Sequence, residues 1–383
     1  MSKANSRKSK WILIVIFTVA VLILYSFFDS QGKVEKPPIP SATPTVQGVA
    51  TQKPSSVPPP IPSTETYYEI YFTDPTNPDD KSVEQALIQK IDASEKSIDL
   101  AVFEFDIEAV GQAIIRAKER GVTVRVVYDN EYSDKDKQMG ELKSEGIPAV
   151  PDNRSALMHN KFFVFDNDCV WTGSFNITNN ASRKNNENAV YFCSPEASAN
   201  YKTEFAEMYS GEFGTTSPSD TPYPTFVING IAVENCFAPE DKCMAKVIKA
   251  VNTAETSIHF LAFSFTYNDL AKTMIANANK GVVVEGIFES RSANTDSSEC
   301  GRLLNKGYDI RLDGNPGTMH QKVIIIDEKI VIFGSFNFSV SADEKNDENL
   351  LIWYDPTLAT VFEEQYQLIK SQAVIPSGTN CSK

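Results

Sequence analysis

Histidine is scarce in this chain, which has only three among its 383 residues. The sequence also contains no Cys-x-x-Cys pair, although it has six cysteines. A structural zinc ion is bound by four cysteine or histidine side chains, which commonly come in closely spaced pairs. Because two of the three histidines belong to another pattern described below, we expect no structural metal site.

Positive charge is also in short supply. Lys and Arg number 36 against 50 Asp and Glu, for a net charge of −14, and without the four basic residues before position 11 the charge is −18. Nucleic-acid binding depends on Lys and Arg that neutralise phosphates, and no basic run with interleaved aromatic residues is present. The composition disfavours a general nucleic-acid surface and broad adhesion to anionic lipid, but it leaves a local basic cleft open.

Long apolar runs are absent except for one near the N-terminus. Residues 11–28 carry no charge over 18 positions and follow Lys3, Arg7, Lys8 and Lys10. This is about the shortest length that crosses a bilayer as a helix, and the basic flank favours a cytoplasmic N-terminus. We expect a cytoplasmic tail at 1–10, a transmembrane signal-anchor at 11–28 and a proline-rich linker at 29–66. A cleaved signal peptide is the alternative, although residues 25–30 make a poor small-residue cleavage site.

The cysteines suit an extracytoplasmic location, where disulfides persist. Six cysteines allow fifteen pairings, so none is assigned. Asn176 and Asn337 lie in formal glycosylation acceptor sequences, yet both belong to the pattern below. A eukaryotic secretory route would risk glycosylating these two asparagines, so a bacterial or archaeal cell surface is the expected location.

What the sequence does contain is one pattern written twice, His-x-Lys-x4-Asp-x6-Gly-Ser-x-Asn, displaced by 161 residues. The first copy consists of His159, Lys161, Asp166, Gly173, Ser174 and Asn176. The second consists of His320, Lys322, Asp327, Gly334, Ser335 and Asn337. The register continues into Glu187 and Asn188 in the first copy and into Glu348 and Asn349 in the second.

These residue types suit the cleavage of a phosphodiester, whose anionic oxygens repel a nucleophile unless donors neutralise them. Histidine titrates near neutral pH, so one imidazole can attack phosphorus while the other protonates the departing oxygen. The candidate donors to the substrate are Lys161, Lys322, Asn176, Asn337, Ser174 and Ser335.

A carboxylate follows each histidine at the same distance. Glu187 and Glu348 lie 28 residues after the histidine of their own copy. A carboxylate there can accept the imidazole N–H and fix its tautomer, as the aspartate of a serine protease triad does.

Strands alternate with amphipathic helices around both copies, which is typical of α/β layers. Residues 97–103 and 257–263 are expected to be matching strands, with helices at 107–120 and 268–280. His259, which lacks the lysine two residues on, is expected to be a strand residue. We expect two α/β/α sandwich repeats at 67–214 and 226–375, a linker at 215–225 that leads into a hairpin at Asn229-Gly230, and a tail at 376–383.

The nucleophile and the acid lie on different copies, so neither half can perform the chemistry alone. The two motifs must face each other across a pseudo-twofold axis and form one active site per chain. We therefore expect a monomer with no obligate protein partner.

The doubled motif resembles that of the phospholipase D superfamily over about residues 67–375, without a substituted position. The resemblance implies a covalent phosphohistidine intermediate and no cofactor or metal ion. It implies His159 as the nucleophile and His320 as the general acid. It implies structural parts at the site for Asp166 and Asp327, and we expect the same of Gly173, Gly334, Asn188 and Asn349.

Members of this superfamily cleave phospholipids, cleave nucleic acid or transfer phosphatidyl groups, all with this constellation. We expect a membrane-anchored enzyme that hydrolyses a phospholipid to phosphatidic acid and an alcohol. Nucleic-acid cleavage without metal, and phosphatidyl transfer of the cardiolipin synthase kind, stay open as alternatives.

Overall fold

The computed structural model describes residues 67–77, 79–378 and 381. The expected cytoplasmic tail, signal-anchor and proline-rich linker, residues 1–66, lie outside the described residues. Among the residues that are described, no helix has the length and apolar character needed to cross a membrane.

The first half is built on a seven-stranded sheet in the order β1-β7-β6-β5-β2-β3-β4. Its strands are β1 (Tyr68–Phe72), β2 (Ser97–Val102), β3 (Thr123–Tyr128), β4 (Ala149–Pro151), β5 (Lys161–Phe165), β6 (Cys169–Gly173) and β7 (Asn188–Cys193). Its helices are α2 (Ser82–Ala93), α3 (Glu108–Glu119), α4 (Asn130–Ser133), α5 (Lys137–Ser144), α6 (Asn179–Arg183) and α7 (Pro195–Ser210). Strands β2, β3 and β4 are parallel, and the other neighbours are antiparallel.

The second half repeats this plan on an eight-stranded sheet in the order β12-β11-β10-β13-β14-β15-β9-β8. Its strands are β8 (Thr225–Ile228), β9 (Ile231–Ala238), β10 (Ser257–Ala262), β11 (Val283–Phe288), β12 (Asp309–Leu312), β13 (Lys322–Ile326), β14 (Ile330–Gly334) and β15 (Glu348–Trp353). Its helices are α8 (Cys243–Val251), α9 (Asn268–Ala278), α10 (Ser290–Ala293), α11 (Cys300–Leu304), α12 (Val340–Glu344) and α13 (Pro356–Gln372), and a 3-10 turn, η1 (Gly214–Thr216), precedes them.

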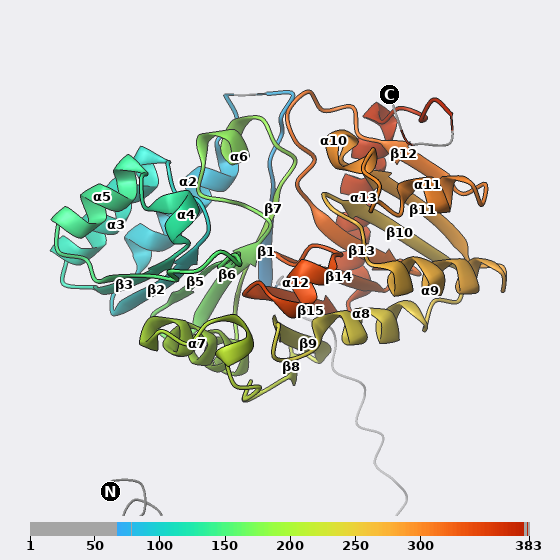
Figure 1. Cartoon of the computed structure of the whole chain (residues 1–383). Coiled ribbons are helices and arrows are strands. Elements are labelled where there is room, and N and C mark those ends of the chain that lie inside the picture. Colours follow the sequence, from blue (N-terminus) through green and yellow to red (C-terminus); the bar gives the residue numbers. More distant parts are fainter. Residues whose placement is uncertain (1–66, 78, 379–380, 382–383) are drawn as a thin grey trace, which may run out of the picture. The chain divides into compact units, whose positions relative to one another are not determined.

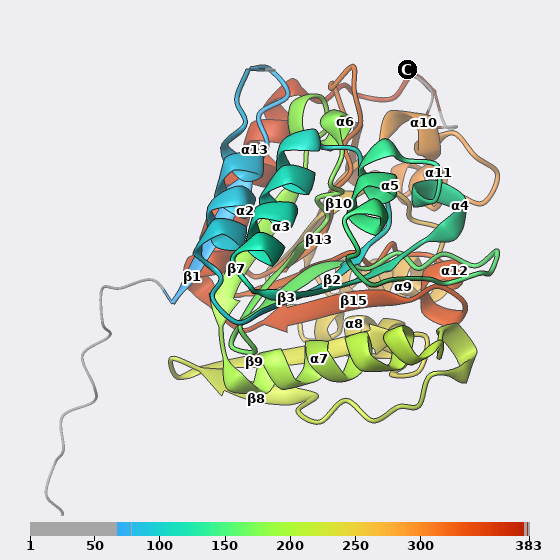
Figure 2. The same cartoon turned by 90° about the vertical axis from the view of Figure 1, so that its left-hand side faces the viewer.

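Helices cover both faces of each sheet, as expected from the alternation in the sequence. In the first half, α2, α3 and α5 lie on one face and α7 on the other (Figures 1 and 2). In the second half, α8 and α9 lie on one face, whereas α13 packs on β10, β13 and β14. The predicted α/β fold with two similar halves is confirmed.

Besides a hydrophobic core of its own, each half contributes to a cluster that both halves share. Buried aromatic residues from both sheets and from α7 and α13 form a single cluster that includes Phe162, Tyr201, Phe237, Trp353 and Phe362. Buried aromatic side chains each remove a large apolar area from water. This shared cluster therefore stabilises the arrangement of the halves that the site between them requires.

A tight turn opens the second half. Asn229 and Gly230 have φ angles of 49° and 80°, and they join β8 to β9. Two successive positive φ angles are the signature of the type I′ hairpin turn that Asn-Gly favours. The predicted hairpin is confirmed, and β8 begins at Thr225, the last residue of the expected linker.

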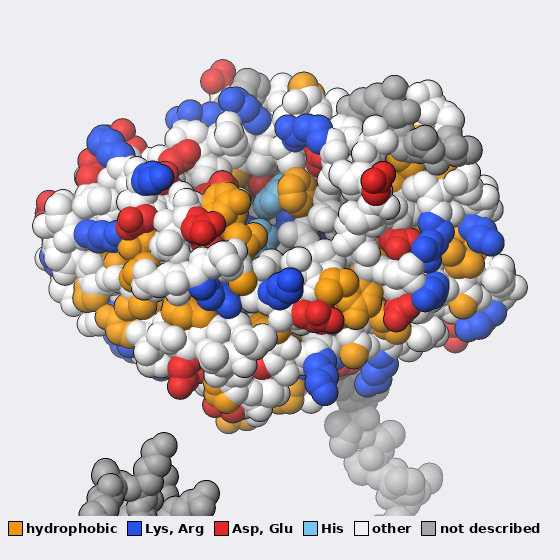
Figure 3. All heavy atoms as spheres, in the orientation of Figure 1, with side chains coloured by type: hydrophobic (Ala, Val, Ile, Leu, Met, Phe, Trp, Pro, Cys, Tyr) orange, Lys and Arg blue, Asp and Glu red, His pale blue; other side chains and the backbone are white. Residues whose placement is uncertain are grey.

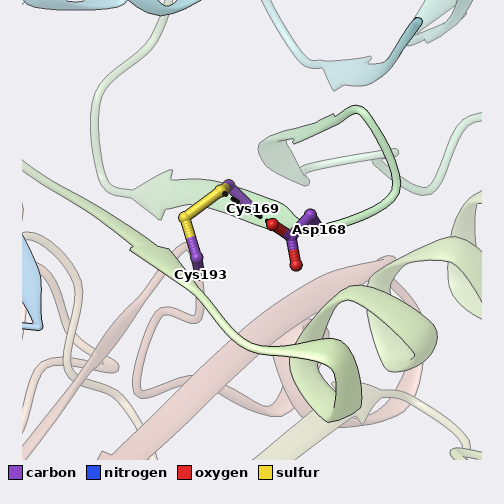
Figure 4. Close-up of side chains that lie close together, drawn as sticks. All are labelled: Asp168, Cys169 and Cys193. Atoms are coloured by element: carbon purple, nitrogen blue, oxygen red, sulfur yellow. Dashed lines mark hydrogen bonds between the residues drawn. A yellow bond between two sulfur atoms is a disulfide. The ribbon is translucent and has the colours of Figure 1, made fainter.

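All six cysteines are paired in disulfides, Cys169–Cys193, Cys236–Cys243 and Cys300–Cys381. The first joins neighbouring strands beside Asp168, as Figure 4 shows. Because both sulfur atoms are bonded to each other, this trio offers no thiolate to a metal ion. The third disulfide attaches the buried Cys381, in the expected tail, to α11.

Candidate active site between the two halves

Both motif histidines lie in the loops that lead into equivalent strands, His159 before β5 and His320 before β13. Each is nearly buried, with 4% and 7% of its surface exposed. Figure 3 shows the histidine atoms at the bottom of a hollow in the face that both halves share. The structure thus brings the two histidines to one place.

Backbone hydrogen bonds across the interface hold these loops. The His159 N–H donates to the Asp347 carbonyl at 2.9 Å, and the His320 N–H donates to the Asn186 carbonyl at 3.0 Å. Each histidine loop is therefore paired with the segment that leads into the other half's motif glutamate.

The consequence is an exchange of carboxylates. His159 Nδ1 lies 2.7 Å from Glu348 Oε2, and His320 Nδ1 lies 2.9 Å from Glu187 Oε2. The prediction that each glutamate serves the histidine of its own copy is wrong. Spacing along the chain could not reveal this, because Glu187, just before β7, and Glu348, at the start of β15, each reach across the interface to the other half's histidine.

The motif serines were expected to donate to the substrate, and in the structure both donate to the motif glutamates instead. Ser174 Oγ donates to Glu187 Oε2 at 2.7 Å, and Ser335 Oγ donates to Glu348 Oε2 at 2.7 Å. Both serines are fully buried. Their hydroxyl protons are already committed to the carboxylates, so these serines orient the glutamates.

The two motif lysines are almost completely buried. Lys161 Nζ donates to the His159 carbonyl at 2.7 Å, and Lys322 Nζ donates to the His320 carbonyl at 2.6 Å. Burial lowers the pKa of Lys161 to about 8 and that of Lys322 to about 7. An anionic ligand between them would favour the charged form of both.

The motif asparagines are in different environments. Asn176 Nδ2 donates to Glu104 Oε2 at 2.8 Å, whereas the structure shows no hydrogen bond of the Asn337 side chain to the described residues. The Oδ1 atoms of both are buried without a partner. Glu104 was not predicted, and its counterpart in the second half is Ser264, so the two sides of the site are not equivalent.

The motif aspartates do not reach the site. Asp166 accepts backbone N–H groups of residues 95–97, and Asp327 accepts those of residues 255–257. Both aspartates therefore fix the turns that follow β5 and β13. The glycines allow close approach, since a Cβ on Gly173 would lie 2.4 Å from the Asn188 carbonyl oxygen and one on Gly334 2.3 Å from that of Asn349.

Asn188 and Asn349 join the halves next to the reacting groups. Asn349 Nδ2 donates to Asn160 Oδ1 at 2.8 Å, and Asn188 Nδ2 donates to Gln321 Oε1 at 3.4 Å. In each case the partner is the residue that follows the other half's histidine.

Two phenylalanines at the site were also missed. The Phe103 ring lies 4.8 Å from the His159 ring, and the Phe263 ring lies 4.7 Å from the His320 ring. Lys161 and Lys322 lie over the same two rings. The signal was present in the sequence, because both residues end the matched strand segments 97–103 and 257–263. The third histidine, His259, lies on β10 as expected and bonds to Glu363.

Burial lowers the pKa of both motif histidines, but not to the same degree. The pKa of His159 falls well below its ordinary value of 6.5, and the charges of Lys161 and Lys322 add to the effect of burial. Burial also lowers the pKa of His320, where the Glu187 carboxylate opposes it. The neutral imidazole is therefore favoured most strongly at His159.

Comparison with known proteins agrees with this geometry. A family model described as cardiolipin synthase, PLD-like domain, matches twice, at residues 87–209 and 247–369. The chain belongs to the phospholipase D superfamily.

Three relatives illustrate the similarity. A phospholipase D of Rickettsia prowazekii is 36% identical over 135 residues, which are 35% of this chain and 65% of that protein. The human mitochondrial cardiolipin hydrolase is 28% identical over 34% of this chain and 52% of its own length. The crystal structure of the Haemophilus influenzae phosphatidylserine synthase is 16% identical, with a TM-score of 0.64 over 82% of this chain and 89% of its own, and shows the fold alone.

Proposed function

We propose that the protein is a phosphodiesterase of the phospholipase D type that hydrolyses a phospholipid to phosphatidic acid and an alcohol. The observation that carries the proposal is the pair of buried histidines, each bonded through Nδ1 to the other half's glutamate. With Nδ1 held, Nε2 is the nitrogen that can react.

In the first step, His159 Nε2 attacks phosphorus, and the bond to the departing oxygen breaks. The low pKa of His159 supports this assignment, because only a neutral imidazole can act as a nucleophile. His320 gives its proton to the leaving alcohol, and Glu187 stabilises the imidazolium form that this role requires.

In the second step, water attacks the phosphohistidine and passes its proton to His320. The diester has then become a monoester, and both imidazoles have returned to their starting state. Lys161, Lys322 and Asn337 neutralise the phosphoryl oxygens throughout, and removal of one such donor elsewhere costs about 3 kcal/mol of barrier. If an alcohol replaced water, the product would be a new diester.

The names of the relatives support a lipid substrate, since the rickettsial and human proteins are a phospholipase D and a cardiolipin hydrolase. The charge of −14 gives no support to a general nucleic-acid surface. Metal-independent nucleic-acid cleavage remains the second candidate, because the reacting groups would be the same. We further propose that residues 11–28 anchor the enzyme at a bacterial or archaeal surface.

The test offers the full chain, without added metal, vesicles of phosphatidylcholine, phosphatidylglycerol or cardiolipin beside single- and double-stranded DNA and RNA. H159A and H320A are the controls. We expect phosphatidic acid from vesicles with the unaltered protein and none with either variant. Shortened nucleic acid together with intact lipid would overturn the lipid assignment. Substantial turnover by both variants would overturn the mechanism.

A further inference from the structure

The two sides of the cleft differ at positions that the repeat makes equivalent. Helices α4 and α10 follow the equivalent strands β3 and β11, so both lie beside the histidine loops. Position 131 is Glu where the second half has Arg291, and position 132 is Tyr where the second half has Ser292. One side therefore presents an aromatic ring and the other a cation.

On the His159 side, aromatic rings lead from the histidine to the surface. The Phe103 ring lies 4.8 Å from His159, and the Tyr132 ring lies 4.4 Å from Phe103. Tyr132 is 47% exposed, so a ligand can reach its ring. Figure 3 shows hydrophobic atoms beside the histidines in the hollow.

This aromatic surface is fixed relative to His159. The Asp129 carboxylate accepts the N–H of Tyr132 at 3.1 Å and the N–H of Met158 at 3.1 Å. Met158 directly precedes His159, so one buried carboxylate joins α4 to the histidine loop. A platform held in this way loses little freedom when a ligand covers it.

On the His320 side, Arg291 occupies the position of Glu131, next to Ser292, and its guanidinium is held in place. Its Nε lies 2.7 Å from Glu289 Oε1, and its Nη2 donates to the Gly317 carbonyl at 2.7 Å and to Thr318. The side chain is 64% exposed, and a guanidinium has five N–H donors, so others remain for a ligand.

We propose that this asymmetry orients the lipid: the acylated phosphatidyl group lies over Phe103 and Tyr132, and the leaving head group lies against Ser292 and Arg291. The inference rests on the proposed function and adds the orientation of the lipid in the site. In-line displacement places the leaving oxygen opposite His159, on the side of His320 and Arg291. The group that stays bonded to His159 is then the one beside the aromatic rings.

The same arrangement selects the head group. A guanidinium binds phosphate and hydroxyl oxygens and repels a quaternary ammonium. The leaving group should therefore carry hydroxyls or a second phosphate, as in phosphatidylglycerol and cardiolipin, in preference to choline.

The aromatic side is tested with the full chain and Y132S, which gives the first half the residue of the second. Y223S is the matched control, because Tyr223 is 46% exposed and precedes β8 in another part of the fold. We expect Y132S to raise KM about tenfold for dioleoyl phosphatidylglycerol, the change that a loss of about 1.4 kcal/mol of binding produces. A short-chain, water-soluble phosphatidylglycerol should be cleaved as before. Equal loss with both chain lengths, or no difference from Y223S, would overturn the orientation.

The basic side is tested with R291Q, and R302Q on α11 is the control because Arg302 is also exposed and paired with a glutamate. We expect the ratio of kcat/KM for phosphatidylglycerol over phosphatidylcholine to fall about tenfold in R291Q, the change that about 1.4 kcal/mol produces, and to stay constant in R302Q. A constant ratio in R291Q would refute the head-group assignment. If the unaltered protein cleaves lipid but both variants resemble their controls, only the orientation fails. If it cleaves no lipid, the proposed function fails as well.

Discussion

At the scale of single residues, the exchange of glutamates gives the two histidines separate supports. Glu348 holds His159, which we assign as the nucleophile, and Glu187 holds His320, which we assign as the acid. The two glutamate variants should therefore fail at different steps, although the residues occupy equivalent places in the repeat.

A diester with a p-nitrophenyl leaving group separates these steps, because p-nitrophenolate departs without a proton. E187Q should release one equivalent of p-nitrophenolate rapidly and then stall, since its second step lacks an oriented base. E348Q should slow this first release about a hundredfold or more, the range that positioned acid and base groups contribute. Rapid-quench measurement of the burst checks both. The opposite pattern would contradict the assignment of His159 as the nucleophile and His320 as the acid.

Ser174 supplies a second prediction at this scale. Its hydroxyl donates to Glu187 and accepts the Asn188 N–H. S174A should lower kcat with little change in KM, because it loosens a carboxylate and removes no contact with the substrate. Steady-state kinetics on phosphatidylglycerol vesicles would decide. An increase in KM at constant kcat would instead indicate that Ser174 contacts the substrate.

The sequence allowed nearly all residues of this site to be identified, but not the hydrogen bonds between them. The repeat identified both histidines, both lysines and both asparagines, and the structure places them together. It could not show that Glu348 belongs to His159, because that contact spans 189 residues and depends on how two sheets face each other. Nor could it identify Glu104, because the second half has Ser264 at the equivalent position and the repeat does not mark it.

At the scale of elements, α7 and the loop after β9 carry a cluster of carboxyl groups close to the site. Glu204 is buried and accepts Asn160 Nδ2 at 3.0 Å, and Asn160 follows His159 in the chain. Burial raises the pKa of Glu207 to about 9 and that of Glu240 to about 7, and nearby Asp220 adds to both effects.

This cluster makes stability depend on pH. In the folded protein, Glu207 and Glu240 keep protons that the unfolded chain releases above the ordinary glutamate pKa of 4.5. Their contribution to the stability of the fold is therefore complete below that pH. The contribution is lost as pH rises through about 7 at Glu240 and about 9 at Glu207. We expect Tm to fall by several degrees, roughly the response to a 1 kcal/mol change, as pH rises from about 5 to about 9.

E240Q should flatten this dependence, because glutamine cannot ionise. E108Q, at an exposed position on α3, is the control and should leave the slope unchanged. Thermal unfolding of the three proteins across the range provides the measurement. Parallel curves for E240Q and the unaltered chain would locate the pH dependence elsewhere.

The elements themselves followed from the sequence where the local signal was strong. The helices expected at 107–120 and 268–280 are Glu108–Glu119 and Asn268–Ala278, and the Asn229-Gly230 turn has the expected form. The attachment of Cys381 to Cys300 could not be predicted, because cysteine pairing depends on tertiary contacts.

At the scale of the molecule, one chain holds one site that both halves complete. In the described residues, both histidines and both glutamates of the site come from the same chain. A mixture of H159A and H320A should therefore remain inactive at every ratio. Vesicle hydrolysis by the mixture measures this, with the unaltered protein diluted into either variant as the reference. Recovery of activity would indicate a site assembled from two chains.

The account depends most on His159 as the residue that becomes covalently bound. Phosphatidyl-p-nitrophenol, offered to H320A and quenched with acid-free denaturant, should leave a phosphatidyl group on His159, which peptide mass spectrometry would locate. The same treatment of H159A should leave no adduct. An adduct on His320 in H159A, with none on His159 in H320A, would contradict the assignment and show that the two histidines have the opposite roles.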